Sequence, residues 1–142
     1  MKPRPRKILV VDDEKDTATA LEGILGKDGH QCFVVYDGPT ALAGMRTFQP
    51  EVVLLDLGLP KMDGYEVARR LREEHGNDKV LLLAVTGYQR DVARLKRARF
   101  DQHLIKPLNL KRLSRLLAAW DNGTRPSLSV NEQDAPALPL PT

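Results

Sequence analysis

Polar residues that could do chemistry occur at the ends of four apolar runs in this sequence. Asp12 and Asp13 follow the first run, Asp56 the third, Thr86 the fourth and Lys106 the fifth. A single aspartate after a strand is more often a turn former or a helix cap than a functional group. Carboxylates, a hydroxyl and an ammonium together are suited to a divalent cation and the oxygens of a phosphoryl group. The set therefore predicts Mg²⁺-dependent phosphoryl chemistry.

Electrostatics explains why these groups would need a cation. If the first and third apolar runs are neighbouring strands, three carboxylates converge, and unit charges about 4 Å apart repel by roughly 4 kcal/mol at an effective dielectric constant of about 20. Mg²⁺ typically takes one or two carboxylates, several waters and a phosphate oxygen. Asp12 and Asp13 are adjacent and can share the ion, which leaves Asp56 as the nucleophile. Lys106 would supply positive charge and Thr86 a hydrogen-bond donor.

The apolar runs themselves are typical of buried strands. They comprise residues 8–11, 32–35, 52–55, 80–85 and 104–105. Their apolar character is continuous, as in parallel strands that are covered on both faces. Stretches with helical spacing follow each run, which predicts an open, doubly wound α/β fold with a five-stranded parallel sheet. Ligands of such sheets bind at the carboxyl ends of the strands, where the polar groups above would meet.

Length and composition are those of one globular domain. The chain has 142 residues, of which 42% are hydrophobic and 29% charged, and a formal net charge of +3. No apolar stretch approaches the ~18 residues of a membrane span or forms a signal peptide, so we expect a cytoplasmic protein without membrane contact. The single cysteine, Cys32, cannot form an intramolecular disulfide. Glycine-rich nucleotide-binding motifs are absent from the sequence.

The two ends of the chain differ in composition from its middle. Residues 1–6 are basic and predict a short flexible arm. Residues 7–121 carry the strand and helix patterns and predict the folded domain. Residues 122–142 contain four prolines and few large apolar residues, which predicts a disordered tail.

Four motifs resemble those of the receiver domain of bacterial two-component response regulators. They are residues 8–14 (ILVVDDE), 53–64 (VLLDLGLPKMDG), 85–87 (VTG) and 104–107 (LIKP). The resemblance covers about residues 6–120 in the family's order and spacing. Within the family, the sequence is similar to chemotaxis regulators and to receivers of hybrid histidine kinases. It implies a flavodoxin-like (βα)5 fold with sheet order 2-1-3-4-5, in which the first and third strands are neighbours.

The resemblance also implies roles for the acidic residues. Asp56 matches the phospho-acceptor and is one of the metal ligands. Asp13 matches the direct Mg²⁺ ligand, and Asp12 its partner through a bound water. The backbone carbonyl of Gly58 would complete the metal site.

Further implied roles lie near the fourth and fifth strands. Thr86 matches the switch hydroxyl and Lys106 the phosphate-binding lysine, and the Lys106–Pro107 bond is typically cis in the family. His103 stands where the family commonly has a Tyr or Phe rotameric switch. If His103 switches, signalling would be pH-sensitive, because an unperturbed imidazole has a pKa of about 6.5. The alternative is an exposed ring with no switching role.

The sequence departs from the family's pattern in two loops. Arg99 stands where the family usually has glycine, which predicts a loop of different shape because a glycine's freedom at positive φ is lost. Gly58 and Tyr88 match positions that flank the approach of water to the phospho-acceptor. These two residues predict a tuned lifetime of the phosphoryl-aspartate.

Basic residues crowd the fourth and fifth predicted helices. The resemblance implies that these helices and the fifth strand form the face that phosphorylation remodels, so we expect a docking face for an acidic protein partner, with a merely solvated surface as the alternative. A sensor histidine kinase would supply the phosphoryl group. Nucleic acid is not an expected partner, because aromatic content is 5% and no helix-turn-helix or stacking motif occurs. The basic residues are Arg90, Arg94, Lys96, Arg97, Arg99, Lys111, Arg112 and Arg115.

These features favour a single-domain response regulator that catalyses only its own phosphorylation and dephosphorylation. One alternative is a receiver domain cut from a hybrid histidine kinase or phosphorelay protein. Another is a Mg²⁺-dependent hydrolase with an aspartyl-phosphate intermediate, although Asp56-Leu57-Gly58 lacks that class's second acid and no insertion could form a cap. A degenerate receiver that binds partners without phosphorylation is disfavoured, because the complete set of polar groups is present.

Overall fold

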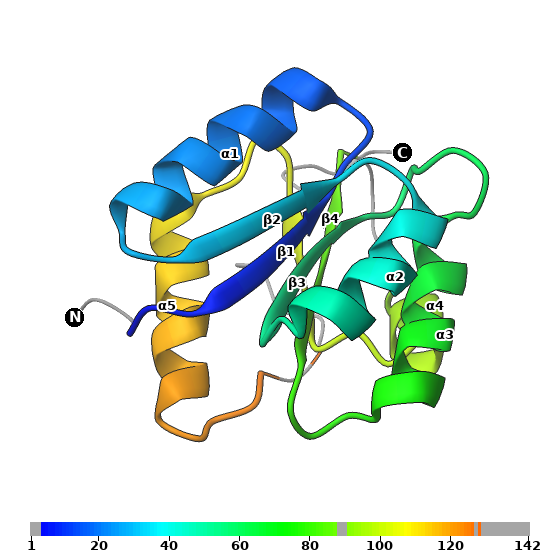
Figure 1. Cartoon of the computed structure of the whole chain (residues 1–142). Helices are drawn as coiled ribbons and strands as arrows, with labels where there is room; N and C mark the ends of the chain where they lie inside the picture. Colours follow the sequence, from blue (N-terminus) through cyan, green and yellow to red (C-terminus); the bar gives the residue numbers. More distant parts are fainter. Residues whose placement is uncertain (1–3, 88–90, 127, 129–142) are drawn as a thin grey trace, which may run out of the picture.

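The computed structural model describes residues 4–87, 91–126 and 128, and it has one five-stranded parallel sheet (Figure 1). The strand order is β2-β1-β3-β4-β5, which confirms the predicted doubly wound α/β sheet. The strands are β1 (Lys7–Val11), β2 (Gln31–Val35), β3 (Val52–Asp56), β4 (Leu81–Thr86) and β5 (Gln102–Ile105).

Helices cover both faces of this sheet (Figure 1). One apolar core joins the sheet to α2, α3 and α4, and a second joins it to α1 and α5. Strands β3 and β4 are buried at every position, as expected of strands between two helical layers. The helices are α1 (Lys15–Lys27), α2 (Gly38–Phe48), α3 (Gly64–His75), α4 (Val92–Arg97) and α5 (Leu110–Asp121).

Side-chain caps fix where most helices begin. The carboxylates of Asp37, Asp63 and Asp91 accept the backbone N–H three residues on at the starts of α2, α3 and α4, and the amide oxygen of Asn109 does the same for α5. Because the strands end just before these turns, the caps fix the chain directly beside the carboxyl edge of the sheet.

The fifth strand begins two residues before the predicted run. Gln102 and His103 are buried and pair with β4. A search for apolar runs misses them because both side chains are polar.

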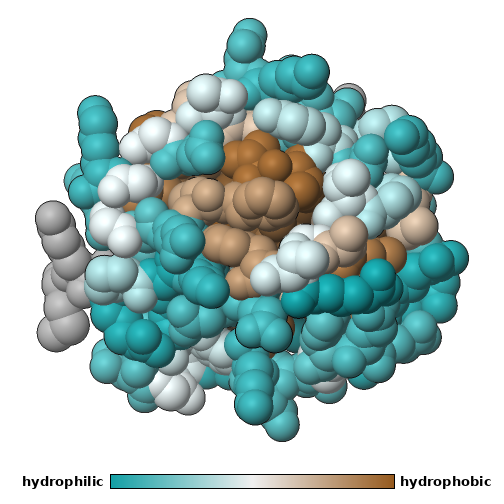
Figure 2. Space-filling view, in the orientation of Figure 1, coloured by the Kyte–Doolittle hydropathy of each residue, from teal (hydrophilic) through white to brown (hydrophobic). Residues whose placement is uncertain are grey.

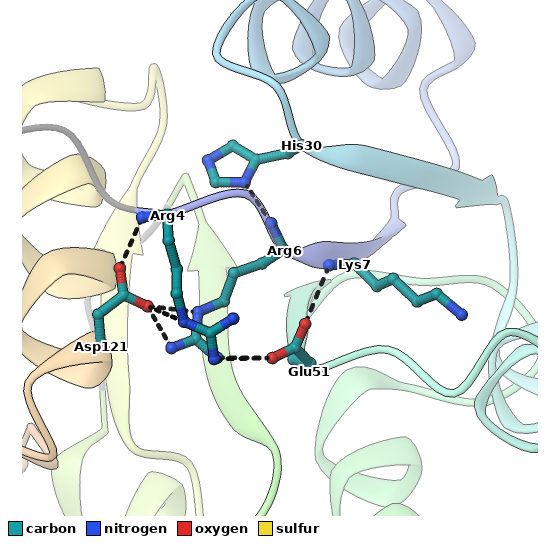
Figure 3. Close-up of polar contacts among 6 residues, drawn as sticks. All are labelled: Arg4, Arg6, Lys7, His30, Glu51 and Asp121. Atoms are coloured by element: carbon teal, nitrogen blue, oxygen red, sulfur yellow. Dashed lines mark hydrogen bonds and ion pairs between the residues drawn. The ribbon is translucent and has the colours of Figure 1, made fainter.

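The N-terminal segment differs from the predicted flexible arm (Figure 3). Arg6 is buried, its Nε donates to Asp121 at 2.6 Å, and its Nη1 donates to Glu51 at 2.7 Å. The backbone N–H of Arg4 also donates to Asp121, at 2.8 Å. Residues 4–6 are therefore fastened to the sheet and to the end of α5, while residues 1–3 lie outside the described part.

The first residues of the predicted disordered tail also pack on the domain. Arg125 forms an ion pair with Asp101 at 3.4 Å and lies over the ring of Trp120 at 4.9 Å. Leu128 is buried in the core beneath α2, α3 and α4. The folded unit thus extends beyond Asp121, and residues 127 and 129–142 lie outside the described part.

The loop after α4 keeps a left-handed residue although glycine is absent. Arg99 has φ of +64°, and its carbonyl accepts a hydrogen bond from Nε of the buried Arg72 at 2.9 Å. The same guanidinium donates to Asp101 at 2.8 Å. The replacement of glycine by Arg99 therefore does not exclude a positive φ, contrary to the expectation from sequence.

No helix in the described ranges is both long and apolar enough to cross a membrane.

Candidate functional site

The acidic residues meet at the carboxyl ends of β1 and β3. These strands are neighbours with Val11 opposite Leu55, so Asp12 and Asp56 follow at the same level. One carboxylate oxygen from each of Asp12, Asp13 and Asp56 lies within 4.8 Å of the others. Asp12 and Asp56 are 5% and 7% exposed, whereas Asp13 is open to solvent. The expected convergence of three carboxylates is therefore present.

Lys106 joins two of these carboxylates from the end of β5. Its Nζ lies 3.1 Å from an oxygen of Asp12 and 3.1 Å from an oxygen of Asp56. Burial by itself lowers the pKa of Lys106, but the hydrogen bonds and charges of the two aspartates outweigh burial and raise it. Burial raises the pKa of the Asp12 carboxyl, against the opposing effect of Lys106 and a backbone N–H.

Glu14 also belongs to the site, although the sequence motifs assigned it no role. Its carboxylate lies 3.8 Å from Nζ of Lys106, and its backbone N–H donates to Asp12 at 2.9 Å. The available signal was the third acid of the run Asp12-Asp13-Glu14. Glu14 thus orients one site carboxylate and adds negative charge beside the lysine.

Thr86 lies at the end of β4, next to the residue that pairs with Asp56. Val85 is the register partner of Asp56, and Thr86 is 5% exposed. The carbonyl of Thr86 accepts the backbone N–H of Lys106 at 2.8 Å. The Lys106–Pro107 peptide bond is cis, as the resemblance implies. The β4 and β5 ends thus deliver a hydroxyl and an ammonium to the edge that carries the carboxylates.

The loop after β3 is folded tightly around the Asp56 side chain. The backbone N–H of Gly58 donates to Asp56 at 3.0 Å. A Cβ added at Gly58 would lie 3.8 Å from the same carboxylate oxygen, so glycine leaves this side of Asp56 open. Tyr88, the other predicted flank, lies outside the described residues.

A second glycine allows α3 to begin directly against β3. A Cβ at Gly64 would lie 2.6 Å from the carbonyl oxygen of Asp56 and 2.7 Å from Cα of Leu57. The N–H of Gly64 donates to the Leu57 carbonyl at 3.1 Å. The dipeptide Asp63-Gly64 therefore combines a helix cap with a close backbone approach, which is a physical reason for this part of the motif.

The donor set fits a hard divalent cation. Asp12, Asp13 and Asp56 carry three negative charges against the single ammonium of Lys106, so this cluster keeps excess negative charge. Carboxylate and carbonyl oxygens are the ligands that Mg²⁺ takes in proteins. The cluster of Asp12, Asp13 and Asp56 thus has the chemistry to hold such an ion, and a ligand role for the Gly58 carbonyl stays a prediction.

His103 is buried, so the alternative of an exposed ring is wrong. The side chain is 0% exposed, and its backbone carbonyl accepts a hydrogen bond from Nη1 of Arg112 at 2.9 Å. This hydrogen bond connects β5 to α5, three residues before the site residue Lys106. Whether His103 acts as a switch stays a prediction.

Comparison with known proteins agrees with this geometry. Residues 8–118 match the response regulator receiver domain family. The chain is 39% identical over 108 residues to the DNA-binding response regulator MtrA of Mycobacterium tuberculosis, a match covering 76% of this chain and 47% of that protein. The chain thus spans about half the length of the curated relatives it matches.

Solved structures of receiver domains are also similar to this chain. The receiver domain of a sensor histidine kinase from Pseudomonas aeruginosa PAO1, which has a magnesium ion coordinated in its active site cleft, is 28% identical with a TM-score of 0.74, covering 84% of this chain and 99% of that one. A CheY-like receiver domain protein from Methanospirillum hungatei shares the fold with a TM-score of 0.77 at 22% identity, covering 84% of this chain and 96% of that one. The chain therefore belongs to the family of response regulator receiver domains.

Proposed function

We propose that Asp56 accepts a phosphoryl group from a phosphohistidine of a sensor histidine kinase, with Mg²⁺ bound beside it. The observation that carries this proposal is the meeting of Asp12, Asp13 and Asp56 at the carboxyl edge of the sheet, with the ammonium of Lys106 against Asp12 and Asp56. Such a set can neutralise a phosphoryl donor and hold the acceptor in place.

The proposed transfer is an in-line displacement. A carboxylate oxygen of Asp56 forms a bond to phosphorus as the phosphorus–nitrogen bond to the kinase imidazole breaks, and the bonding electrons leave with the imidazole. Lys106 would shift its hydrogen bond from Asp56 to a phosphoryl oxygen, and Thr86 would donate its hydroxyl to another. Mg²⁺, when bound, would offset the charge on the phosphoryl oxygens.

The proposed output surface is the face formed by α4, β5 and α5. Exposed basic residues gather on its two helices, while Asp91 is the exposed acid at the start of α4. This excess of positive charge suits an acidic protein partner through steering that salt would weaken. The exposed basic residues on or beside the helices are Arg94, Lys96, Arg97, Arg99, Lys111 and Arg115.

The name of the curated relatives bears against the expectation that nucleic acid is no partner. They are called DNA-binding response regulators, and this chain matches about half of their length. We retain an acidic protein as the proposed partner and include duplex DNA as the competitor in the test. Binding of DNA with a steep salt dependence by this chain would replace the protein partner with DNA.

Intact-mass measurement tests the phosphoryl transfer. The protein is incubated with a small phosphodonor and Mg²⁺, and we expect one phosphoryl group per chain in the wild type and none in Asp56→Asn. Asp78→Asn, at the opposite end of the sheet, is the matched control and should behave as wild type. An unmodified wild type would contradict the proposal, and continuing release of phosphate over many turnovers from a phosphomonoester would favour the hydrolase instead.

A second context, onward relay of the phosphoryl group, is supported by one comparison. The receiver that is 28% identical to this chain belongs to a sensor histidine kinase. In this context the phosphorylated chain would pass its phosphoryl group to a histidine of a phosphotransfer protein. Loss of label from Asp56 with matching gain on that histidine would establish a relay, whereas loss to water alone would favour a terminal switch.

A further inference from the structure

Strand β2 is an edge strand of the sheet, and in the described part of the chain some of its backbone N–H and C=O groups have no hydrogen-bond partner. In the described part of the chain β2 pairs with β1 alone. The N–H of Gln31 donates to Arg6 at 2.9 Å, and the carbonyl of Val35 accepts from Asp12 at 3.1 Å, so these two residues point their backbone groups toward β1. Since this direction alternates along a strand, Cys32 and Val34 point theirs outward. No hydrogen bond to those outward groups occurs among the described residues.

The side chains along this edge are uncharged, and all but Gln31 are apolar. The whole strand, Gln31–Val35, contains no charged residue and no proline. Phe33 is 43% exposed, and its ring lies against that of Phe48, with ring centroids 5.4 Å apart. Figure 2 shows an apolar patch in the middle of the view, where β2 lies in Figure 1. Exposed apolar edge strands without charges are typical sites of strand pairing.

The other edge strand, β5, has a side chain bound to one of its outward backbone groups, unlike β2. Lys106 donates its N–H to Thr86, so the alternation along β5 directs the backbone of His103 away from β4. The carbonyl of His103 accepts a hydrogen bond from Arg112 at 2.9 Å, which occupies this edge with a charged side chain. Strand β2 has no comparable cover among the residues that the structure describes.

We propose that two copies of this protein pair through their β2 strands in antiparallel orientation. With Phe33 opposite its own copy, Cys32 lies opposite Val34 of the second copy. The outward N–H and C=O groups of these residues then form two reciprocal hydrogen-bonded pairs about a two-fold axis. The two Phe33 rings meet on the α2 face, and the sheets join into one. The five residues of the strand itself bring no charge to this contact.

A second copy fits this edge better than an unrelated segment, because the pattern is self-complementary. The outward residues are two positions apart, so a two-fold axis through Phe33 pairs every free group with its counterpart. The Asp56 site lies beyond β1 at the ends of the central strands. Pairing therefore leaves the phosphoryl site open, and it holds or fails independently of phosphoryl transfer.

Substitution at Val34 tests the backbone bonds. Val34→Pro removes the outward N–H and no bond to β1, so an edge strand can accept it without loss of the fold. Val34→Thr keeps the N–H and is the matched control. Sedimentation velocity over a concentration series should show dimers for the wild type and Val34→Thr and only monomers for folded Val34→Pro. A monomeric wild type throughout, or dimers of folded Val34→Pro, would overturn the proposal.

A cross-link test remains decisive even where Val34→Pro unfolds. Opposed residues in a non-hydrogen-bonded antiparallel pair have Cα atoms about 4.5 Å apart, within the range of a disulfide. In a Cys32→Ser background, Phe33→Cys should give a covalent dimer under mild oxidation. Arg115→Cys, exposed on α5, should stay monomeric. Cross-linking of Arg115→Cys with none at Phe33→Cys would place the interface elsewhere and refute pairing through β2.

Discussion

At the scale of single residues, the charge balance of the acidic cluster is the dominant feature. Asp12 and Asp56 both use the ammonium of Lys106, while Asp13 adds a third negative charge from the exposed side. A cluster arranged in this way binds a cation at the expense of the stability of the cation-free protein. The same charges that would favour a bound cation thus weaken the fold when no metal is bound.

Asp13→Asn should therefore stabilise the protein in the absence of Mg²⁺. We expect the free energy of unfolding to rise by about 1 kcal/mol, the repulsion between unit charges about 4 Å apart in water. The additional stability that saturating Mg²⁺ gives the wild type should be largely lost in this variant. Urea unfolding with and without Mg²⁺ measures both effects, with Asp78→Asn as the control. A full Mg²⁺ response of Asp13→Asn would exclude Asp13 as a ligand.

His30 provides a second prediction, on the pH dependence of stability. Its Nδ1 accepts the backbone N–H of Arg6 at 3.0 Å, and its ring is buried. Burial lowers the pKa of His30 from its ordinary value of 6.5, despite the opposing charges of Asp28 and Asp121. The unfolded chain therefore binds a proton more readily than the folded one. The neutral His30 ring therefore contributes to the free energy of unfolding. That contribution is fully present above pH 6.5 and is lost as the pH falls from 6.5 through the lowered pKa.

Replacement of His30 tests whether this residue makes the free energy of unfolding fall as the pH falls. His30→Asn keeps an acceptor for the Arg6 N–H but does not titrate, so the free energy of unfolding should fall less steeply between about pH 7.5 and 5. Urea unfolding across that range measures the slope, and His75→Asn on α3 serves as the control. An unchanged slope in His30→Asn would assign the pH dependence to other groups.

At the scale of elements, the start of α3 sets the distance between a helix and the site strand. Gly64 approaches the backbone of Asp56 and Leu57 too closely for any Cβ. Gly23 lies inside α1 with no heavy atom within 4 Å of an added Cβ. The two glycines therefore have opposite expected responses to the same substitution.

Gly64→Ala should destabilise the protein by roughly 1–3 kcal/mol, because the methyl group overpacks against backbone that cannot move freely. Gly23→Ala should stabilise it by about 0.5–1 kcal/mol, since alanine is the better helix former and open space receives the methyl group. Thermal and urea unfolding of both variants measure the difference. Equal effects of the two substitutions would contradict the close approach at Gly64.

At the scale of the whole molecule, the first and last described segments, residues 4–6 and 122–126, fasten the edge of the sheet opposite the site. Arg6 links β1 to Glu51 before β3 and to Asp121 at the end of α5 (Figure 3). Arg125 reaches Asp101, whose carboxylate also holds the buried Arg72. Arg6 and Arg125 thus stabilise the arrangement of α5 and β5 at the end of the sheet opposite the site.

A chain that ends at Asp121 should be less stable than one that ends at Leu128. The shorter chain loses the burial of the Leu128 side chain, which contributes about 1.5–3 kcal/mol, and a half-exposed ion pair that contributes about 1 kcal/mol or less. Urea unfolding of the two truncated chains measures the difference. Equal midpoints would show that the folded unit ends at Asp121, as composition alone suggested.

Local sequence determined the strands, the order of the elements and the polar residues at the strand ends. Continuous apolar runs predicted the strands because a strand buried on both faces needs apolar side chains at every position. Asp56 and Lys106 were recognised because each directly follows such a run. The start of β5 escaped detection because Gln102 and His103 are polar yet buried. Apolar periodicity cannot record a polar residue that packing places inside.

Tertiary structure alone decided the contacts between distant segments. Lys106 lies equally near Asp12 and Asp56. Arg72 binds Asp101 and the carbonyl of Arg99, whose φ is positive. Arg6 reaches Asp121, and Arg125 reaches Asp101. These partners are separated by tens of residues, and their pairing depends on which strands become neighbours. That choice comes from the free energy of burying both faces of the whole sheet, which no single stretch of sequence carries.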